Sequence, residues 1–155
     1  MKKLYLMRHA HAPPPAHAGV KSDALRPLSE QGRRDAKLMA GEILKRGGRP
    51  SLLLHSPLLR AAQTAGDAAL ALKAPAESFP LLDNTRPAEE VLAALEKRAA
   101  AVDELIAVGH QPQIGELAAL LTDRILEIRP AGVVAIEWAP EPRLLWTLNA
   151  DELAT

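Results

Sequence analysis

A short apolar run near the amino terminus constrains this chain more than any other feature. Residues 4–7 read Leu-Tyr-Leu-Met, a strand-like sequence, and Arg8 and His9 follow directly, ahead of a proline-rich loop. Open α/β sheets hold their ligands in a crevice beyond the carboxyl ends of their strands. A strand that delivers an arginine and a histidine together at that end therefore predicts a functional site at the edge of an α/β sheet.

Short apolar runs and helical patterns alternate along the rest of the chain. Strands are predicted at residues 3–7, 51–55, 76–81 and 104–108, and helices at 29–47, 57–72, 87–101 and 113–121. Two later runs, 133–138 and 143–148, predict an antiparallel pair, and the tail from residue 151 is expected to be frayed. For residues 1–155 we expect one α/β domain, a three-layer sandwich with a mostly parallel central sheet, helices on both faces and an antiparallel carboxyl-terminal edge.

The composition excludes several classes of protein. Lysine plus arginine and aspartate plus glutamate both total 19, so the chain lacks the net positive charge that nucleic acids and anionic membranes attract. Cysteine is absent, which excludes disulfide bonds, thiol catalysis and cysteine-bound metals. The first apolar run is too short for a signal peptide, and no stretch approaches the length of a membrane span. We expect a cytoplasmic protein that binds neither nucleic acid nor membrane.

Two further strand ends carry residues suited to anion binding. After the second predicted strand, Ser56 as N-cap and Pro57 as first helical residue predict a helix start. Arg60 then falls in the first turn, beside free N–H groups and the positive end of the helix dipole. The fourth predicted strand ends just before His110. Together with the arginine and histidine that follow the first strand, these side chains can address one anion.

The segments at these positions resemble the histidine phosphatase superfamily, to which the phosphoglycerate mutases are related. The matching segments are residues 8–10 (RHA), 26–32 (RPLSEQG), 56–65 (SPLLRAAQTA) and 108–110 (VGH). The resemblance runs over residues 1–121, and the short length makes the chain most similar to the compact bacterial phosphohistidine phosphatases. It implies a phosphoglycerate mutase-like fold.

The resemblance also implies catalytic roles. His9 would be the nucleophile that becomes a phosphohistidine, while Arg8, Arg60 and His110 would bind the phosphoryl oxygens. Phosphoryl transfer places negative charge on those oxygens, and fixed donors stabilise it without a metal. Neighbouring positive charge should also favour the neutral, nucleophilic form of His9. The expected protein is a metal-independent phosphatase without a cofactor.

The expected substrate is a phosphohistidine on a protein, such as a histidine phosphotransfer domain. Many family members carry a glutamate as general acid after the third strand, but residues 80–85 read PLLDNT, with an apolar residue in its place. Asp83 is a candidate acid, and the competing interpretation is an aspartate in a polar turn. A phosphate ester needs a proton donor more than a phosphohistidine does. The alternatives are a phosphatase for a small phosphate ester and a non-catalytic module that binds phosphate or a phosphoprotein.

The remaining histidines give a competing hypothesis. His11 lies two residues after His9, so a metal site built from His9, His11 and His110 is conceivable. Arginines beside a cation would be unfavourable, so we favour the anion site. We expect His17 and His55 to be a loop residue and a strand-end residue.

Two positions near the arginine–histidine pair need the structure for a decision. Arg26 either reaches the phosphate from its loop or is simply solvated. Ala10 stands where the family most often has glycine, so a positive φ at this position would be strained.

Overall fold

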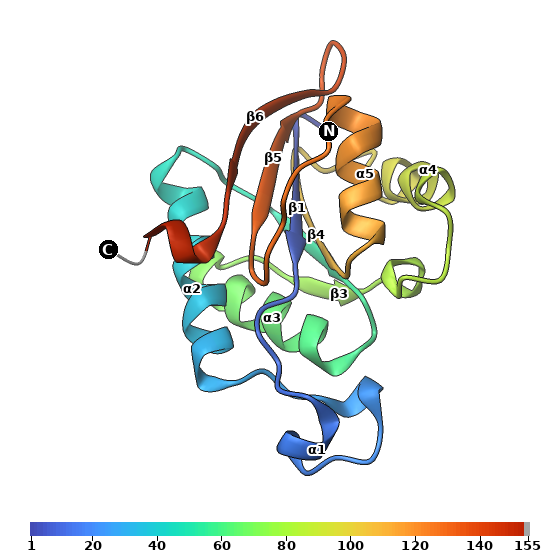
Figure 1. Ribbon diagram of the computed structural model, residues 1–155. Coiled ribbons are helices and arrows are strands. Elements are labelled where there is room, and N and C mark those ends of the chain that lie inside the picture. The colour runs from blue at the N-terminus through green and yellow to red at the C-terminus, as the bar shows by residue number, and fades with distance from the viewer. Residues whose placement is uncertain (154–155) are drawn as a thin grey trace.

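The computed structural model describes residues 1–153 and contains a six-stranded sheet in the order β3-β2-β4-β1-β5-β6 (Figure 1). The first four strands in the chain pair in parallel, whereas β5 and β6 run antiparallel at one edge. The strands are β1 Lys3–Arg8, β2 Leu52–His55, β3 Ala76–Ser78, β4 Glu104–Gly109, β5 Val133–Glu137 and β6 Arg143–Leu148. The predicted α/β sandwich with an antiparallel carboxyl-terminal edge is confirmed.

Strand β1 lies in the interior of the sheet, because it is hydrogen-bonded to a neighbouring strand on each side. Leu6 pairs with Ala107 of β4 on one side and with Val134 of β5 on the other. Helices cover both faces of the sheet as well, so residues 4–7 are at most 2% exposed. This burial on every side explains why the strand reads as a continuous apolar run rather than an alternating one.

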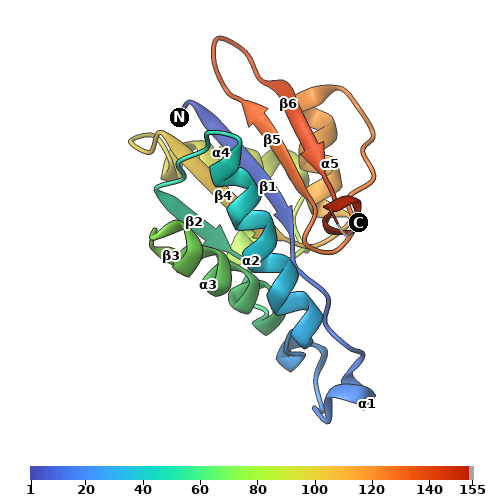
Figure 2. The same cartoon turned by 90° about the vertical axis from the view of Figure 1, so that its left-hand side faces the viewer.

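Four long helices form the two outer layers. Figure 2 shows α2 (Glu30–Lys45) and α3 (Leu59–Leu72) on one face of the sheet and α4 (Ala88–Arg98) and α5 (Gln113–Thr122) on the other. Side chains of a strand alternate between faces, so Tyr5 and Met7 join the core beneath α2 and α3, while Leu4 and Leu6 join the core beneath α4 and α5. Within residues 1–153, no helix combines the length and apolarity needed to cross a membrane.

Several predicted boundaries are wrong, and the reasons are local. Strand β3 is an exposed edge strand that ends at Ser78, because Pro80 has no N–H for the ladder and starts a 3-10 helix. Pro87 precedes α4 as its N-cap instead of lying inside its first turn. Residues 151–153, expected to be frayed, belong to the 3-10 helix Ala150–Leu153, and Arg129 donates a hydrogen bond to Asp151 in that helix. The last part of that predicted tail, residues 154–155, lies outside the described residues.

Between β1 and α2 the chain leaves the body of the molecule as an arm, which we define as residues 13–28. The arm contains the four-residue helix α1 (Pro15–Ala18) and the 3-10 helix Asp23–Leu25. In Figures 1 and 2 it projects beyond the carboxyl end of β1. It therefore lies at the sheet edge where the sequence predicts the site.

Candidate active site

Backbone pairing brings three strand ends together. Arg8 is opposite Gly109 in the β1–β4 ladder, and His55 is opposite Val108 in the β2–β4 ladder. The hydrogen bonds continue one residue further, because the N–H of His9 donates to Gly109 and that of Ser56 donates to Val108. The residues after β1, β2 and β4 consequently lie side by side.

His9 presents one ring nitrogen as a base. Its Nδ1 lies 2.7 Å from the carbonyl oxygen of Ala10. A carbonyl oxygen can only accept, so Nδ1 carries the proton and Nε2 holds the free lone pair. Burial, with smaller contributions from His110, Arg60 and Arg8, lowers the pKa of His9 to about 3. The neutral form expected of His9 is therefore favoured, with burial contributing more than the arginines, and its role as the nucleophile stays a prediction.

His110 faces His9 across the site, with the two ring centroids 5.1 Å apart. It is only 4% exposed, and its Nε2 lies 2.7 Å from the hydroxyl oxygen of Ser56. Burial first, and then the charge of Arg60, lowers the pKa of His110 to about 4. Both histidines are therefore neutral near pH 7.

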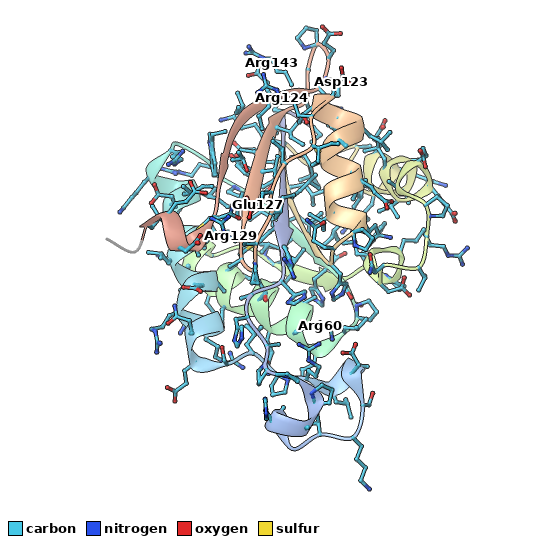
Figure 3. The ribbon with its side chains drawn as sticks, in the orientation of Figure 1. Arg60, Asp123, Arg124, Glu127, Arg129 and Arg143 are labelled. Atoms are coloured by element: carbon cyan, nitrogen blue, oxygen red, sulfur yellow. The ribbon has the colours of Figure 1, made fainter. Side chains whose placement is uncertain are left out.

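Arg60 reaches the same place from α3, as Figure 3 shows at the carboxyl end of the sheet next to the arm. Its terminal nitrogens donate to Asp23, one to the backbone oxygen at 2.9 Å and the other to the carboxylate at 3.1 Å. Arg8 donates from Nη1 to the backbone oxygen of Ile128 at 3.1 Å. Hydrogen bonds to protein oxygens therefore hold both guanidinium groups in place.

The cluster leaves buried polar atoms without hydrogen-bond partners. Four such side-chain atoms are found within residues 1–153, and three belong to this site: Nε of Arg8, Nε of Arg60 and Nδ1 of His110. Buried N–H groups without a partner are costly, so native proteins rarely keep them outside functional sites. Two guanidinium groups and an imidazole that converge in this way fit a tetrahedral oxyanion.

Arg26 fastens the arm. Its guanidinium donates to the backbone oxygens of Pro13 and Ala12 at 2.9 and 2.8 Å and to the carboxylate of Asp23 at 2.9 Å. The interpretation of Arg26 as simply solvated is therefore wrong. The other interpretation, a contact between Arg26 and phosphate, stays a prediction. The hydrogen bond from Arg26, followed by the charge of Arg60, lowers the pKa of Asp23.

Asp23 is a contact of the site arginine Arg60 that sequence reasoning missed. Its carboxylate joins Arg26 and Arg60, although 37 positions separate Asp23 from Arg60. The one available signal was its position within the arm, three residues before Arg26. Without the fold, nothing in the sequence indicates that this part of the arm meets α3.

Asp83 lies in a polar turn, which was the competing interpretation. One oxygen of its carboxylate accepts hydrogen bonds from the N–H and the hydroxyl of Thr85. The residue is nevertheless close enough for its charge to raise the pKa of His110 slightly against the effect of burial. Donation of a proton by Asp83 stays a prediction.

The other histidines do not join the site. Nδ1 of His11 lies 2.7 Å from the hydroxyl of Ser29, and His55 contacts the backbone of Ser56 at the end of β2. His17 lies in α1 rather than in a loop. Across residues 1–153, no three histidine, aspartate, glutamate or cysteine side chains are grouped so that they could hold a metal ion. The structure therefore does not gather His9, His11 and His110 as ligands.

Two expectations about backbone geometry are corrected. Helix α3 starts at Leu59 and not at Pro57, with Leu58 as its N-cap. The hydroxyl of Ser56 accepts from the N–H of Leu58 at 3.2 Å and also contacts His110, so Ser56 belongs to the turn before the helix. Arg60 is still in the first turn.

Ala10 needs no glycine-like conformation. It is fully buried, its φ is not positive, and its N–H donates to the hydroxyl of Thr64 at 3.0 Å. The alanine that departs from the commonest family pattern is therefore unstrained.

Comparisons with known proteins agree with this geometry. Residues 4–128 match the model of the histidine phosphatase superfamily (branch 1). An uncharacterized protein of Picosynechococcus sp. is 36% identical over 140 residues, which cover 86% of this chain and 84% of that protein.

Two solved structures are similar over nearly the whole chain. One is the protein histidine phosphatase SixA complexed with tungstate, with a TM-score of 0.86 and 25% identity over 97% of this chain and 99% of that one. The other is a putative phosphohistidine phosphatase SixA from Agrobacterium tumefaciens, with a TM-score of 0.81 and 24% identity over 95% and 97% of the two chains. The implied phosphoglycerate mutase-like fold is confirmed.

Proposed function

Because the chain belongs to the histidine phosphatase superfamily, we propose that it is a phosphatase that works through a phosphohistidine on His9. One observation carries the proposal: the free Nε2 of a neutral His9 lies in a cluster with the unpartnered Nε–H groups of Arg8 and Arg60 and the unpartnered Nδ1 of His110. A nucleophile without a competing proton and a set of buried donors for an oxyanion are the two requirements of phosphoryl transfer to an enzyme.

The proposed reaction has two steps. In the first, Nε2 of His9 attacks phosphorus, the bond between phosphorus and the leaving group breaks, and the leaving group takes a proton from solvent, while His9 keeps the proton on Nδ1. In the second, water attacks the phosphohistidine, which releases phosphate and restores the neutral imidazole. In both steps Arg8, Arg60 and His110 hold the equatorial oxygens, where the negative charge of the transition state lies.

The preferred substrate is a phosphohistidine on a protein, for example on a histidine phosphotransfer domain. Its leaving imidazole has an ordinary pKa of about 6.5 and can take a proton from solvent near neutrality, so it needs little help from the enzyme. Transfer to His9 exchanges one phosphorus–nitrogen bond for another. The similar SixA structures support this choice of substrate. One of them is a protein histidine phosphatase in complex with tungstate, a tetrahedral oxyanion.

A small phosphate ester is the alternative substrate. An alkoxide leaves only with a proton, and Asp83 is the candidate donor near His110. The N–H and the hydroxyl of Thr85 both donate to one oxygen of this carboxylate, and these contacts hold Asp83 in its turn, which argues against this role. The third candidate, a non-catalytic phosphate-binding module, would have no use for the free lone pair of His9.

The experiment compares kcat/KM for a phosphorylated histidine phosphotransfer domain, an aryl phosphate and an alkyl phosphate. We expect clear activity on the first two and very weak activity on the third, with the same ranking in Asp83→Asn. A flat dependence on leaving-group pKa that steepens in Asp83→Asn would make Asp83 the acid and a phosphate ester the substrate. Absence of turnover with all three, together with tight phosphate binding, would favour the binding module.

A further inference from the structure

Ser56 is fully buried and fixed at the point where β2 meets the site. Its N–H donates to the backbone oxygen of Val108, which ties it to the end of β4. Its hydroxyl oxygen lies 2.7 Å from Nε2 of His110. The contact joins two strand ends that are 54 positions apart in the sequence, and the proposed mechanism does not yet use it.

The proton on this contact can be assigned by counting donors and acceptors. A serine hydroxyl has one proton to donate and can accept two hydrogen bonds. The N–H of Leu58 already donates to the Ser56 oxygen at 3.2 Å. Within residues 1–153 the nearest acceptor found for the Ser56 proton is Nε2 of His110, since no other hydrogen bond from this hydroxyl is present.

The opposite assignment leaves two groups unsatisfied. If Nε2 of His110 carried the proton, the buried Ser56 hydroxyl would have no acceptor for its own proton. Nδ1 of His110 would then present a lone pair from a buried position to an anion bound by Arg8 and Arg60. A lone pair beside an oxyanion is repulsive, whereas an N–H is attractive.

We propose that Ser56 is a positioning residue that holds His110 in the tautomer with the proton on Nδ1, so that this nitrogen donates to the phosphoryl group. The role of the donor rests on the proposed function, whereas the tautomer is a property of the free protein. Neutral His9 and neutral His110 then have opposite hydrogen-bonding capacities toward the site. Backbone contact with Ala10 leaves His9 a free acceptor, and the Ser56 hydroxyl leaves His110 a free donor.

Nitrogen-15 NMR of labelled protein without substrate tests this directly, because protonated and unprotonated imidazole nitrogens have well-separated shifts. We expect wild-type His110 to show a protonated Nδ1 and an unprotonated Nε2 near pH 7. In Ser56→Ala the population with a proton on Nε2 should rise. A proton on Nε2 in the wild type, or unchanged populations in a folded Ser56→Ala, would overturn the proposal.

Ser29→Ala is the matched control, since Ser29 makes a similar contact of 2.7 Å with His11 outside the site. It should change the signals of His11 and leave those of His110 unchanged. Inorganic phosphate should bind about tenfold more weakly to Ser56→Ala, the loss expected when one hydrogen bond to a charged group is weakened. Ser56→Thr, which keeps the hydroxyl, should restore both the tautomer and the affinity.

The outcomes separate the two claims. A protonated Nδ1 in a protein that hydrolyses no phosphate compound keeps the role of Ser56 and removes the proposed function. Turnover through His9 together with a protonated Nε2 on His110 keeps the proposed function and removes the role of Ser56. If Ser56→Ala fails to fold, the wild-type shifts still decide the tautomer.

Discussion

At the scale of single residues, the two histidines of the site depend on hydrogen bonds made by their other ring nitrogens. The carbonyl of Ala10 fixes the proton of His9, and the hydroxyl of Ser56 contacts His110. These contacts explain how two neutral imidazoles 5.1 Å apart can perform different tasks.

The lowered pKa values predict how stability depends on pH. The pKa of His9 is about 3 in the folded chain and about 6.5 when unfolded, so at intermediate pH the unfolded chain binds a proton that the folded chain does not. The free energy of unfolding should therefore fall as the pH drops from about 6.5 towards 3. The pKa of about 4 for His110 acts in the same direction.

Urea unfolding near pH 7 and near pH 5 measures this effect. The loss of stability between the two values should be smaller in His9→Gln and in His110→Gln than in the wild type. An identical loss in all three proteins would contradict the lowered pKa values.

Arg60 allows a prediction about catalysis. Arg60→Ala removes a buried donor that Asp23 orients. The variant should lose about 2.7 to 4 kcal/mol of transition-state stabilisation, the range for preorganised donors, and this loss should appear as a lower kcat/KM. Arg98→Ala, which removes an arginine paired with Glu77 on the surface, is the control and should keep full activity. A loss of less than tenfold in Arg60→Ala would make Arg60 a structural residue.

At the scale of elements, the arm is attached to the site mainly through polar contacts of Asp23 and Arg26. Asp23→Asn removes the charge that holds Arg60 and Arg26, so residues 13–28 should be cleaved faster in limited proteolysis. The ion pair is exposed on the Asp23 side, so kcat/KM should fall only about two- to fivefold, as for a pair worth up to about 1 kcal/mol.

Asp103→Asn is the control, because Asp103 is exposed and forms an ion pair with Lys2, the residue just before β1. It should change neither the proteolysis pattern nor the kinetics. A rise of kcat/KM in Asp23→Asn would show that repulsion between Asp23 and the substrate outweighs the orientation of Arg60.

The elements that the sequence predicts best are the buried ones. The apolar runs of β1, β2 and β4 are continuous because helices cover both faces, and the residues at their ends, Arg8, His9 and His110, lie side by side at one edge of the sheet. The exposed edge strand β3 lacks such a run, and its end depends on Pro80. Prolines also mark helix starts only approximately, as Pro57 and Pro87 show.

The contacts that complete the site could not be predicted, because they join distant segments. Asp23 meets Arg60 across 37 positions and Ser56 meets His110 across 54. Neither contact has a local signature, and Ser56 also fits a helix cap, a role that hides its contact with the histidine.

At the scale of the whole molecule, the proposed chemistry needs no metal or cofactor, because two strand ends supply Arg8 and His110 and helix α3 supplies Arg60 as donors. Activity should therefore survive excess chelator, measured as kcat/KM before and after treatment with EDTA and gel filtration. Loss of activity with EDTA that zinc restores would point to a metal-dependent reaction instead.

The most direct test of the central claim is to find the phosphoryl group on His9. The protein is mixed with a phosphorylated histidine phosphotransfer domain, quenched in alkali, where phosphohistidine is stable, and analysed by phosphorus-31 NMR and peptide mass spectrometry. We predict one phosphoryl group on Nε2 of His9, formed before phosphate is released and absent from His9→Ala, which should fold but not turn over. Phosphate release without this adduct, or turnover by His9→Ala, would contradict the account.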